Sequence, residues 1–213
     1  METLKDQAAI VGIGHTEYSR DSGRSEMSLA VEAIRNAIVD AGLKPTDIDG
    51  IAKYGMDNNS EIDIAANLGI PALRFFGEVG YGGGGGPVGS VMLGAMAVAT
   101  GIANYVVAFR AMNERSGRGT PRFGQAAVRK GAPGANGYQE PFGLFSPAQM
   151  VALAARRHMH LYGTKSEHFG AIAVACRTHA LNNPNAVIAE TPGVISENPR
   201  GPQNCPKLSA TAV

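Results

Sequence analysis

Apolar and polar positions follow two alternating patterns along this chain, one typical of strands and one typical of helices. Continuous apolar runs predict buried strands at residues 8–15, 51–56, 73–79 and 105–109. Apolar residues at helical spacing predict helices at residues 27–41, 61–68, 88–103, 147–162 and 165–181. The alternation of strands and helices in the first half predicts an α/β fold, with a mostly parallel sheet and helices on both faces.

The stretch around which we expect the fold to be organised joins the third predicted strand to the third predicted helix. Five consecutive glycines at residues 82–86 are followed by Pro87, which suits the first turn of a helix. The helix at 88–103 carries no charge, so we expect it to be central and buried on every face. Its N-terminus could bind an anion or an oxyanion, but a tight turn that only allows close packing explains the glycines equally well.

Polar residues at the carboxyl ends of the predicted strands are the candidates for binding a ligand, because ligands of parallel sheets bind at that edge. Solvated or ion-paired loop contacts are the alternative for each charged residue. The candidate substrate-binding residues are Asp57, Tyr81, Gly82, Gly83, Gly84, Gly85, Asn113 and Arg115, and Arg110 and Glu114 fall at the same edge. Gly12 and Gly14 do not form a dinucleotide-binding motif, because Glu17 stands where the third glycine is needed.

Composition restricts the class of protein. The chain has 213 residues, of which 44% are hydrophobic, enough for a substantial core. A net charge of +1 gives no reason to expect a nucleic-acid or anionic-membrane surface. The two cysteines are too few for a disulfide framework or a metal site, and we expect Cys176 to be a core thiol on the apolar stripe of its helix. With no leader peptide and no membrane-length apolar stretch, the expected location is the cytoplasm.

The domain organisation follows from where these patterns stop. We expect one domain over residues 1–186, with a long loop insertion at 113–145, and an extended or disordered proline-rich tail at 187–213. Four basic residues of the loop could meet ligand phosphates or simply be solvated: Arg118, Arg122, Arg129 and Lys130. His158 and His160 point apart on their helix, cannot share a metal, and are expected at the surface.

Several segments together resemble the thiolase superfamily, most closely the sterol carrier protein X thiolases and the thiolase-like lipid-transfer proteins of steroid side-chain degradation. The matching segments are residues 10–16, 29–42, 46–51, 81–84, 95–101, 107–117, 123–125 and 179–186. The resemblance implies a five-layer αβαβα fold of two similar halves, of which this chain supplies the first. It also implies a homodimer that pairs through residues 105–109.

The sequence departs from the thiolase pattern at the nucleophile. Thiolases carry a catalytic cysteine in the turn before the central helix, where this chain has Gly84, so no acyl-enzyme can form there. The catalytic His and second Cys of thiolases belong to a second half that this sequence does not contain. We therefore expect a truncated or frameshifted chain, or one part of an assembly.

Cysteine-free members of this family imply a different reaction. Thiolase-like lipid-transfer proteins are retro-aldolases that cleave a β-hydroxyacyl-CoA, work with a small OB-fold, zinc-ribbon partner, and use a base that is a tyrosine of the second half. Coenzyme A would enter as part of the substrate, with no tightly bound cofactor and no metal in this chain. Tyr81 would be a pocket residue only. Two alternatives remain, an acyl-CoA acyltransferase of the ordinary thiolase type and a non-catalytic subunit that binds acyl-CoA or serves as a scaffold.

Overall fold

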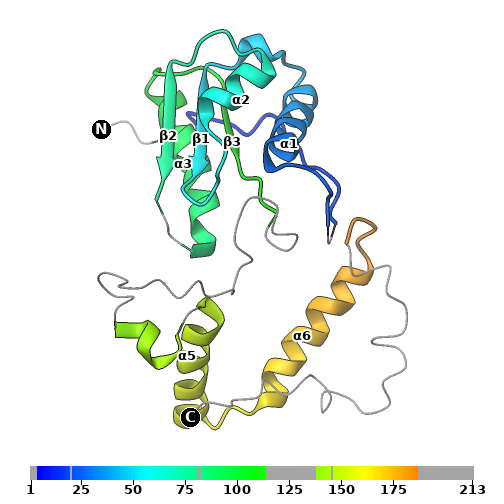
Figure 1. Cartoon of the computed structure of the whole chain (residues 1–213), viewed down its shortest axis with the longest axis vertical. Helices are drawn as coiled ribbons and strands as arrows, with labels where there is room; N and C mark the ends of the chain where they lie inside the picture. The colour runs from blue at the N-terminus through cyan, green and yellow to red at the C-terminus, as the bar shows by residue number, and fades with distance from the viewer. Residues whose placement is uncertain (1–3, 20, 81–82, 114–137, 145, 187–213) are drawn as a thin grey trace. The chain divides into compact units, whose positions relative to one another are not determined.

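The computed structural model describes residues 4–19, 21–80, 83–113, 138–144 and 146–186 (Figure 1). The chain divides into two compact units, one of residues 1–17 and 21–122 and one of residues 18–20 and 123–213. Among the described residues, no helix is long and apolar enough to cross a membrane.

The first unit is built on a parallel sheet of three strands in the order β2-β1-β3. The strands are β1 (Gly50–Tyr54), β2 (Phe75–Val79) and β3 (Val106–Phe109). β1 is buried along its whole length, since it lies between the other two strands and is covered on both faces. Three of the four predicted strands and their parallel arrangement are therefore confirmed.

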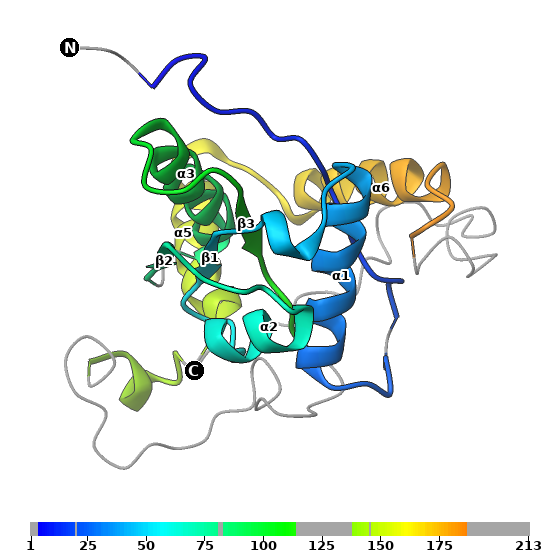
Figure 2. The same ribbon diagram turned by 90° about the horizontal axis from the view of Figure 1, so that it is seen from above.

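Two helices cover one face of the sheet, α1 (Glu26–Asp40) and α2 (Glu61–Leu68) (Figure 2). Ser25 and Ser60 cap their N-termini by accepting backbone hydrogen bonds from Ser28 and Ile62. Glycines in the left-handed conformation follow both helices, at Gly42 and Gly69. The core on this face comprises Leu29, Ile34, Ile38, Ile48, Ile51, Ile64, Leu68 and Phe109, among others. A short 3₁₀ helix, η1 (Pro45–Asp47), leads into β1.

The other face of the sheet is covered by α3 (Gly86–Ala99). Small residues bring this helix close to the strands, because Gly86, Ser90, Gly94 and Ala97 are its buried positions. The prediction of burial on every face is wrong for the described chain. The sheet covers only one side of α3, so the side chains of the opposite side are exposed, namely Val88, Val91, Met92 and Met96.

The predicted strand at residues 8–15 is also wrong. This segment is extended but pairs with no strand among the described residues, and Ile10, Val11 and Ile13 are exposed. It lies instead against α1, where a Cβ atom on Gly12 would come within 2.3 Å of the Ala37 carbonyl oxygen. An apolar run predicts a strand only if a neighbouring strand is there to satisfy its backbone.

The described part of the second unit is helical, with η3 (Glu140–Phe142), α5 (Pro147–Tyr162) and α6 (Ser166–Leu181). His158 and His160 are exposed on α5, as predicted. Cys176 is exposed on α6 rather than buried, because no described element of this unit packs on that stripe of the helix. The expected tail at 187–213 and most of the expected loop insertion lie outside the described residues.

Candidate functional site

The glycine run forms a 3₁₀ turn, η2 (Gly83–Gly85), that leads directly into α3. Tyr54 lies at the carboxyl end of β1, is only 1% exposed, and contacts this turn. Its hydroxyl donates to the Gly83 carbonyl oxygen at 3.1 Å, and its ring lies so close to Gly86 that a Cβ atom there would be 2.0 Å from Cε2. Gly86 is therefore required for packing, and Gly83 for its positive φ of 61°.

The next two glycines have a different environment. A Cβ atom on Gly84 or Gly85 would meet no atom within 4 Å, so this side of the turn is open. The first N–H groups of α3 lack acceptors within the helix, and its dipole places partial positive charge at this end. The packing interpretation thus applies to Gly86, whereas binding of an anion or oxyanion at the open Gly84 and Gly85 remains a prediction.

A cation lies beside the same turn. The Arg110 guanidinium, which follows β3, stands 5.6 Å from the centre of the Tyr54 ring, and its Nη2 is 2.8 Å from the Met112 Sδ. Arg110 is exposed at the carboxyl edge of the sheet. The edge therefore combines a helix N-terminus with a positively charged side chain, which favours a ligand carrying negative charge.

Asp57 ties the carboxyl ends of β1 and β3 together. One carboxylate oxygen accepts from the Ala111 N–H at 2.7 Å, and the other accepts from the backbone N–H and side-chain amide of Asn59, both at 2.8 Å. Burial raises the pKa of Asp57 above its ordinary value, and the hydrogen bonds from Ala111 and Asn59 and the charge of Lys53 oppose that rise. Its carboxylate positions the loop after β3, and contact with a ligand remains a prediction.

Asn113 forms a second set of hydrogen bonds between distant segments at this edge, which we call the Asn113 clasp. Its side-chain amide donates to the Arg24 carbonyl oxygen at 2.8 Å, and its amide oxygen accepts from the Ser22 hydroxyl at 2.8 Å. Its backbone N–H donates to the buried Glu26 carboxylate at 3.0 Å, which also accepts from the Asn58 amide. Asn113 thus fixes the loop before α1 against the end of β3. Its contact with a ligand also remains a prediction.

Sequence reasoning missed Lys53, the residue before Tyr54 on β1. Its ammonium group is largely buried and lies 3.1 Å from the Asn59 carbonyl oxygen, 3.5 Å from the Glu78 carboxylate and 3.7 Å from the Glu61 carboxylate. A single lysine inside an apolar strand was the available signal, because a buried ammonium needs partners. Lys53 joins β1, β2 and the start of α2 at the edge that carries the glycine turn.

Several predicted residues lie outside the described part of the chain. These are Tyr81, Gly82, Glu114, Arg115, Arg118, Arg122, Arg129 and Lys130. Within the described residues, no three His, Cys, Asp or Glu side chains gather in a way that could hold a metal ion.

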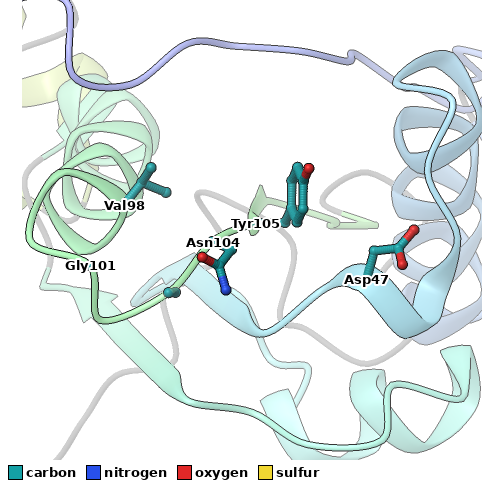
Figure 3. A pocket seen from close by; sticks show the side chains of 6 residues that line it. Asp47, Val98, Gly101, Asn104 and Tyr105 are labelled. Carbon is teal, nitrogen blue, oxygen red and sulfur yellow. The ribbon is translucent and has the colours of Figure 1, made fainter.

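A separate hollow of about 470 Å³ lies at the opposite edge of the sheet, before β1 and β3 (Figure 3). Some polar groups of its wall are paired, because the Asn104 backbone N–H and side-chain amide and the Tyr105 N–H donate to the Asp49 carboxylate at 2.9 to 3.0 Å. The carboxyl edge, with its open glycines and cation, is the better candidate.

Comparison with known proteins gives consistent relatives, although no family model matches the chain. The sequence is 50% identical over 200 residues to a steroid side-chain-cleaving aldolase of Thermomonospora curvata, covering 93% of this chain and 51% of the relative. It is also 50% identical over 200 residues to a 17-hydroxy-3-oxo-4-pregnene-20-carboxyl-CoA lyase of Mycobacterium tuberculosis, covering 92% of this chain and 51% of the relative.

A solved structure and a more distant relative agree with these matches. The structure titled Ltp2-ChsH2(DUF35) aldolase superposes with a TM-score of 0.78 at 50% identity, covering 90% of this chain and 48% of that one. An acetyl-CoA acetyltransferase of Methanothermobacter thermautotrophicus is 28% identical over 190 residues, covering 84% of this chain and 46% of the relative. The chain spans about half the length of each of these proteins.

Proposed function

Because the chain belongs to the thiolase-like lipid-transfer proteins of the thiolase superfamily, we propose that it takes part in retro-aldol cleavage of a β-hydroxyacyl-CoA in steroid side-chain degradation. The observation that carries this proposal is 50% identity, over 93% of the chain, to a steroid side-chain-cleaving aldolase. Glycine at position 84, in an open turn at the start of α3, is the feature of the site that agrees with it.

The proposed reaction breaks one carbon–carbon bond without a covalent enzyme intermediate. A base removes the proton of the β-hydroxyl group, and the oxygen lone pair forms the carbonyl of a departing ketone. The bond between the α and β carbons breaks, and its electrons move to the thioester oxygen as an enolate. Protonation of the α carbon then gives the shortened acyl-CoA. The reaction needs a base and a stabilised enolate oxygen.

This chain's contribution is the stabilised oxygen and part of the binding surface. Free N–H groups in the first turn of α3, next to the open glycines, could donate to the enolate oxygen, and the helix dipole favours charge there. Arg110 could pair with an anionic part of the substrate. Coenzyme A then acts as part of the substrate, and the resemblance to the family assigns the base to a residue outside this sequence.

We propose a partner protein as well. The solved relative is titled as an assembly of Ltp2 with ChsH2(DUF35), and this chain matches it over 90% of its own length. We expect a comparable small partner, of the OB-fold and zinc-ribbon type that the family resemblance implies, and a homodimer of this chain.

The test is turnover of 17-hydroxy-3-oxo-4-pregnene-20-carboxyl-CoA by the purified chain, with and without the partner. A steroid ketone and a shortened acyl-CoA, appearing in equal amounts, are expected when the half of the Thermomonospora curvata relative that this sequence does not match is supplied as well. Acyl transfer to free coenzyme A instead would contradict the proposal. Iodoacetamide provides the control, because it should modify the exposed Cys176 while cleavage continues.

The second candidate is a non-catalytic subunit that binds acyl-CoA or a partner. It agrees with Gly84, which has no side chain that could be acylated. Equilibrium binding of the same acyl-CoA, with no product in the complemented assembly, would establish it. In either case we expect Gly86→Ala, which disturbs the glycine turn, to weaken binding more than Gly84→Ala.

A further inference from the structure

Tyr54 contacts both the glycine turn and the cation beside it from the middle strand of the sheet. It is the last residue of β1, where its backbone is in register with Val79 of β2. Side chains alternate along a strand, so Tyr54 points toward α3, whereas Lys53 before it points toward Glu61 at the start of α2. Since only 1% of Tyr54 is exposed, it cannot touch a substrate. Any effect of Tyr54 on a reaction must therefore act through other residues.

The Tyr54 hydroxyl restrains the first residue of the turn. It donates to the Gly83 carbonyl oxygen at 3.1 Å, and Gly83 has a positive φ of 61°. The next two residues, Gly84 and Gly85, have the backbone freedom of glycine and open space beside them. Donors stabilise a developing negative charge well only if they are already held in place before the reaction. The hydroxyl supplies such a restraint at the start of the turn.

The Tyr54 ring restrains the end of the turn and the cation. A Cβ atom on Gly86 would lie 2.0 Å from Cε2, so the backbone at the start of α3 rests directly on the ring. The Arg110 guanidinium lies 5.6 Å from the ring centre, and a cation at such a distance is attracted by the π electrons. One rigid side chain thus contacts both groups that favour a negative charge at this edge.

We propose that Tyr54 is a positioning residue for the proposed cleavage, because its hydroxyl holds the turn that stabilises the enolate oxygen and its ring holds Arg110 against the same turn. This inference rests on the proposed function. The two contacts have separable effects on the kinetics. Loss of the hydroxyl bond disturbs donors that meet charge only in the transition state, so kcat falls. Loss of the ring also releases Arg110, which binds the substrate throughout, so KM rises as well.

A tyrosine that only fills the core would act through stability alone. Any core substitution with a comparable loss of stability would then have the same kinetic effect, provided that the protein is folded in the assay. Ile38→Val provides this comparison, since Ile38 is 2% exposed and belongs to the core under α1. That core lies on the face of the sheet opposite α3, so Ile38→Val leaves the glycine turn and Arg110 unchanged.

The test is steady-state cleavage of 17-hydroxy-3-oxo-4-pregnene-20-carboxyl-CoA by the full chain, co-expressed with the half of the Thermomonospora curvata relative that this sequence does not match. Circular dichroism first establishes that each variant is folded at the assay temperature. Tyr54→Phe keeps the ring and loses the hydroxyl, so kcat should fall about tenfold while KM stays within about twofold. Tyr54→Leu, or Tyr54→Met if leucine prevents folding, should lower kcat further and raise KM about threefold or more. Ile38→Val should leave both constants within about twofold.

The outcomes separate this inference from the proposed function. Equal kinetic constants for Tyr54→Phe and Ile38→Val would overturn the positioning role, and so would a rise in KM without a fall in kcat for Tyr54→Phe. If the assembly with the unsubstituted chain cleaves nothing, the proposed function fails, and equilibrium binding of the same acyl-CoA decides the role of the ring. Tyr54→Leu or Tyr54→Met should then bind about threefold or more weakly than Ile38→Val. Equal affinities, or no binding by the unsubstituted chain, would overturn the inference.

Discussion

Replacing Gly86 by alanine tests whether Tyr54 holds the glycine turn in place. The added Cβ would lie 2.0 Å from Cε2, 2.4 Å from Cδ2 and 2.8 Å from Cζ of the Tyr54 ring, whereas ordinary contact begins near 3.4 Å. The ring is 1% exposed and has little room to move, so either it or the start of α3 must shift by more than 1 Å.

The expected cost can be worked from these contacts. Overpacking of a tight core costs about 1–3 kcal/mol, and displacement of the ring breaks the hydrogen bond to Gly83, worth about 1 kcal/mol. Alanine recovers about 0.4–1 kcal/mol by restricting the unfolded chain. We therefore expect Gly86→Ala to lower the free energy of unfolding by about 1–3.5 kcal/mol.

Urea denaturation followed by circular dichroism measures this cost, with a midpoint lowered by about 1 M. Gly84→Ala is the matched control, since its Cβ meets no atom within 4 Å, and its effect should stay within about 0.5 kcal/mol. In a Tyr54→Leu background the penalty of Gly86→Ala should fall by at least about 1 kcal/mol. Equal effects of the two alanines, or an unchanged penalty in that background, would refute the reasoning.

Three further substitutions address the carboxyl edge of the sheet. The pKa of Asp57 is raised, so between its ordinary value of 3.8 and the raised value the folded state keeps a proton that the unfolded state has lost. The free energy of unfolding therefore falls as the pH rises through that window. Asp57→Asn should abolish this slope in pH-dependent unfolding, and it should cost about 1–3 kcal/mol because an amide cannot accept all three hydrogen bonds. Asn113→Ala should cost about 1–3 kcal/mol and speed amide exchange at residues 22–26, and unchanged exchange there would contradict the clasp. Lys53→Met should lower the free energy of unfolding measured by urea denaturation by about 1–2 kcal/mol, a moderate cost because Glu61 and Glu78 keep partial access to solvent. Lys53→Arg keeps the positive charge, so its free energy of unfolding should lie closer to that of the original protein.

Local signals in the sequence were enough to predict most elements of the first unit. Helix α2 occupies residues 61–68 as predicted, because Ser60 caps its start and Gly69 ends it in the left-handed conformation. The order of strands and helices predicted the parallel sheet, and with it the edge at which Asp57, Arg110 and Asn113 are found. These features depend on residues close to one another in the chain.

Features that depend on distant neighbours could not be predicted in the same way. The apolar runs at residues 8–15 and in α3 specify what could be buried, but not whether a strand or a second layer covers them. The partners of Asp57 and Asn113 also come from far along the chain, from Ala111 and from the loop before α1. No periodicity in the sequence indicates such pairs.

The clasp at Asn113 has a consequence for the order of folding. Its hydrogen bonds to Glu26, Arg24 and Ser22 close loops of 87, 89 and 91 residues, whereas α2 and the turn into α3 form from neighbours in the chain. Closing loops of this length costs chain entropy before the contacts that they bring together can compensate for it. The edge that carries the candidate site should thus assemble after the sheet, and under mild stress the protein should lose its ligand-binding edge while its core remains folded.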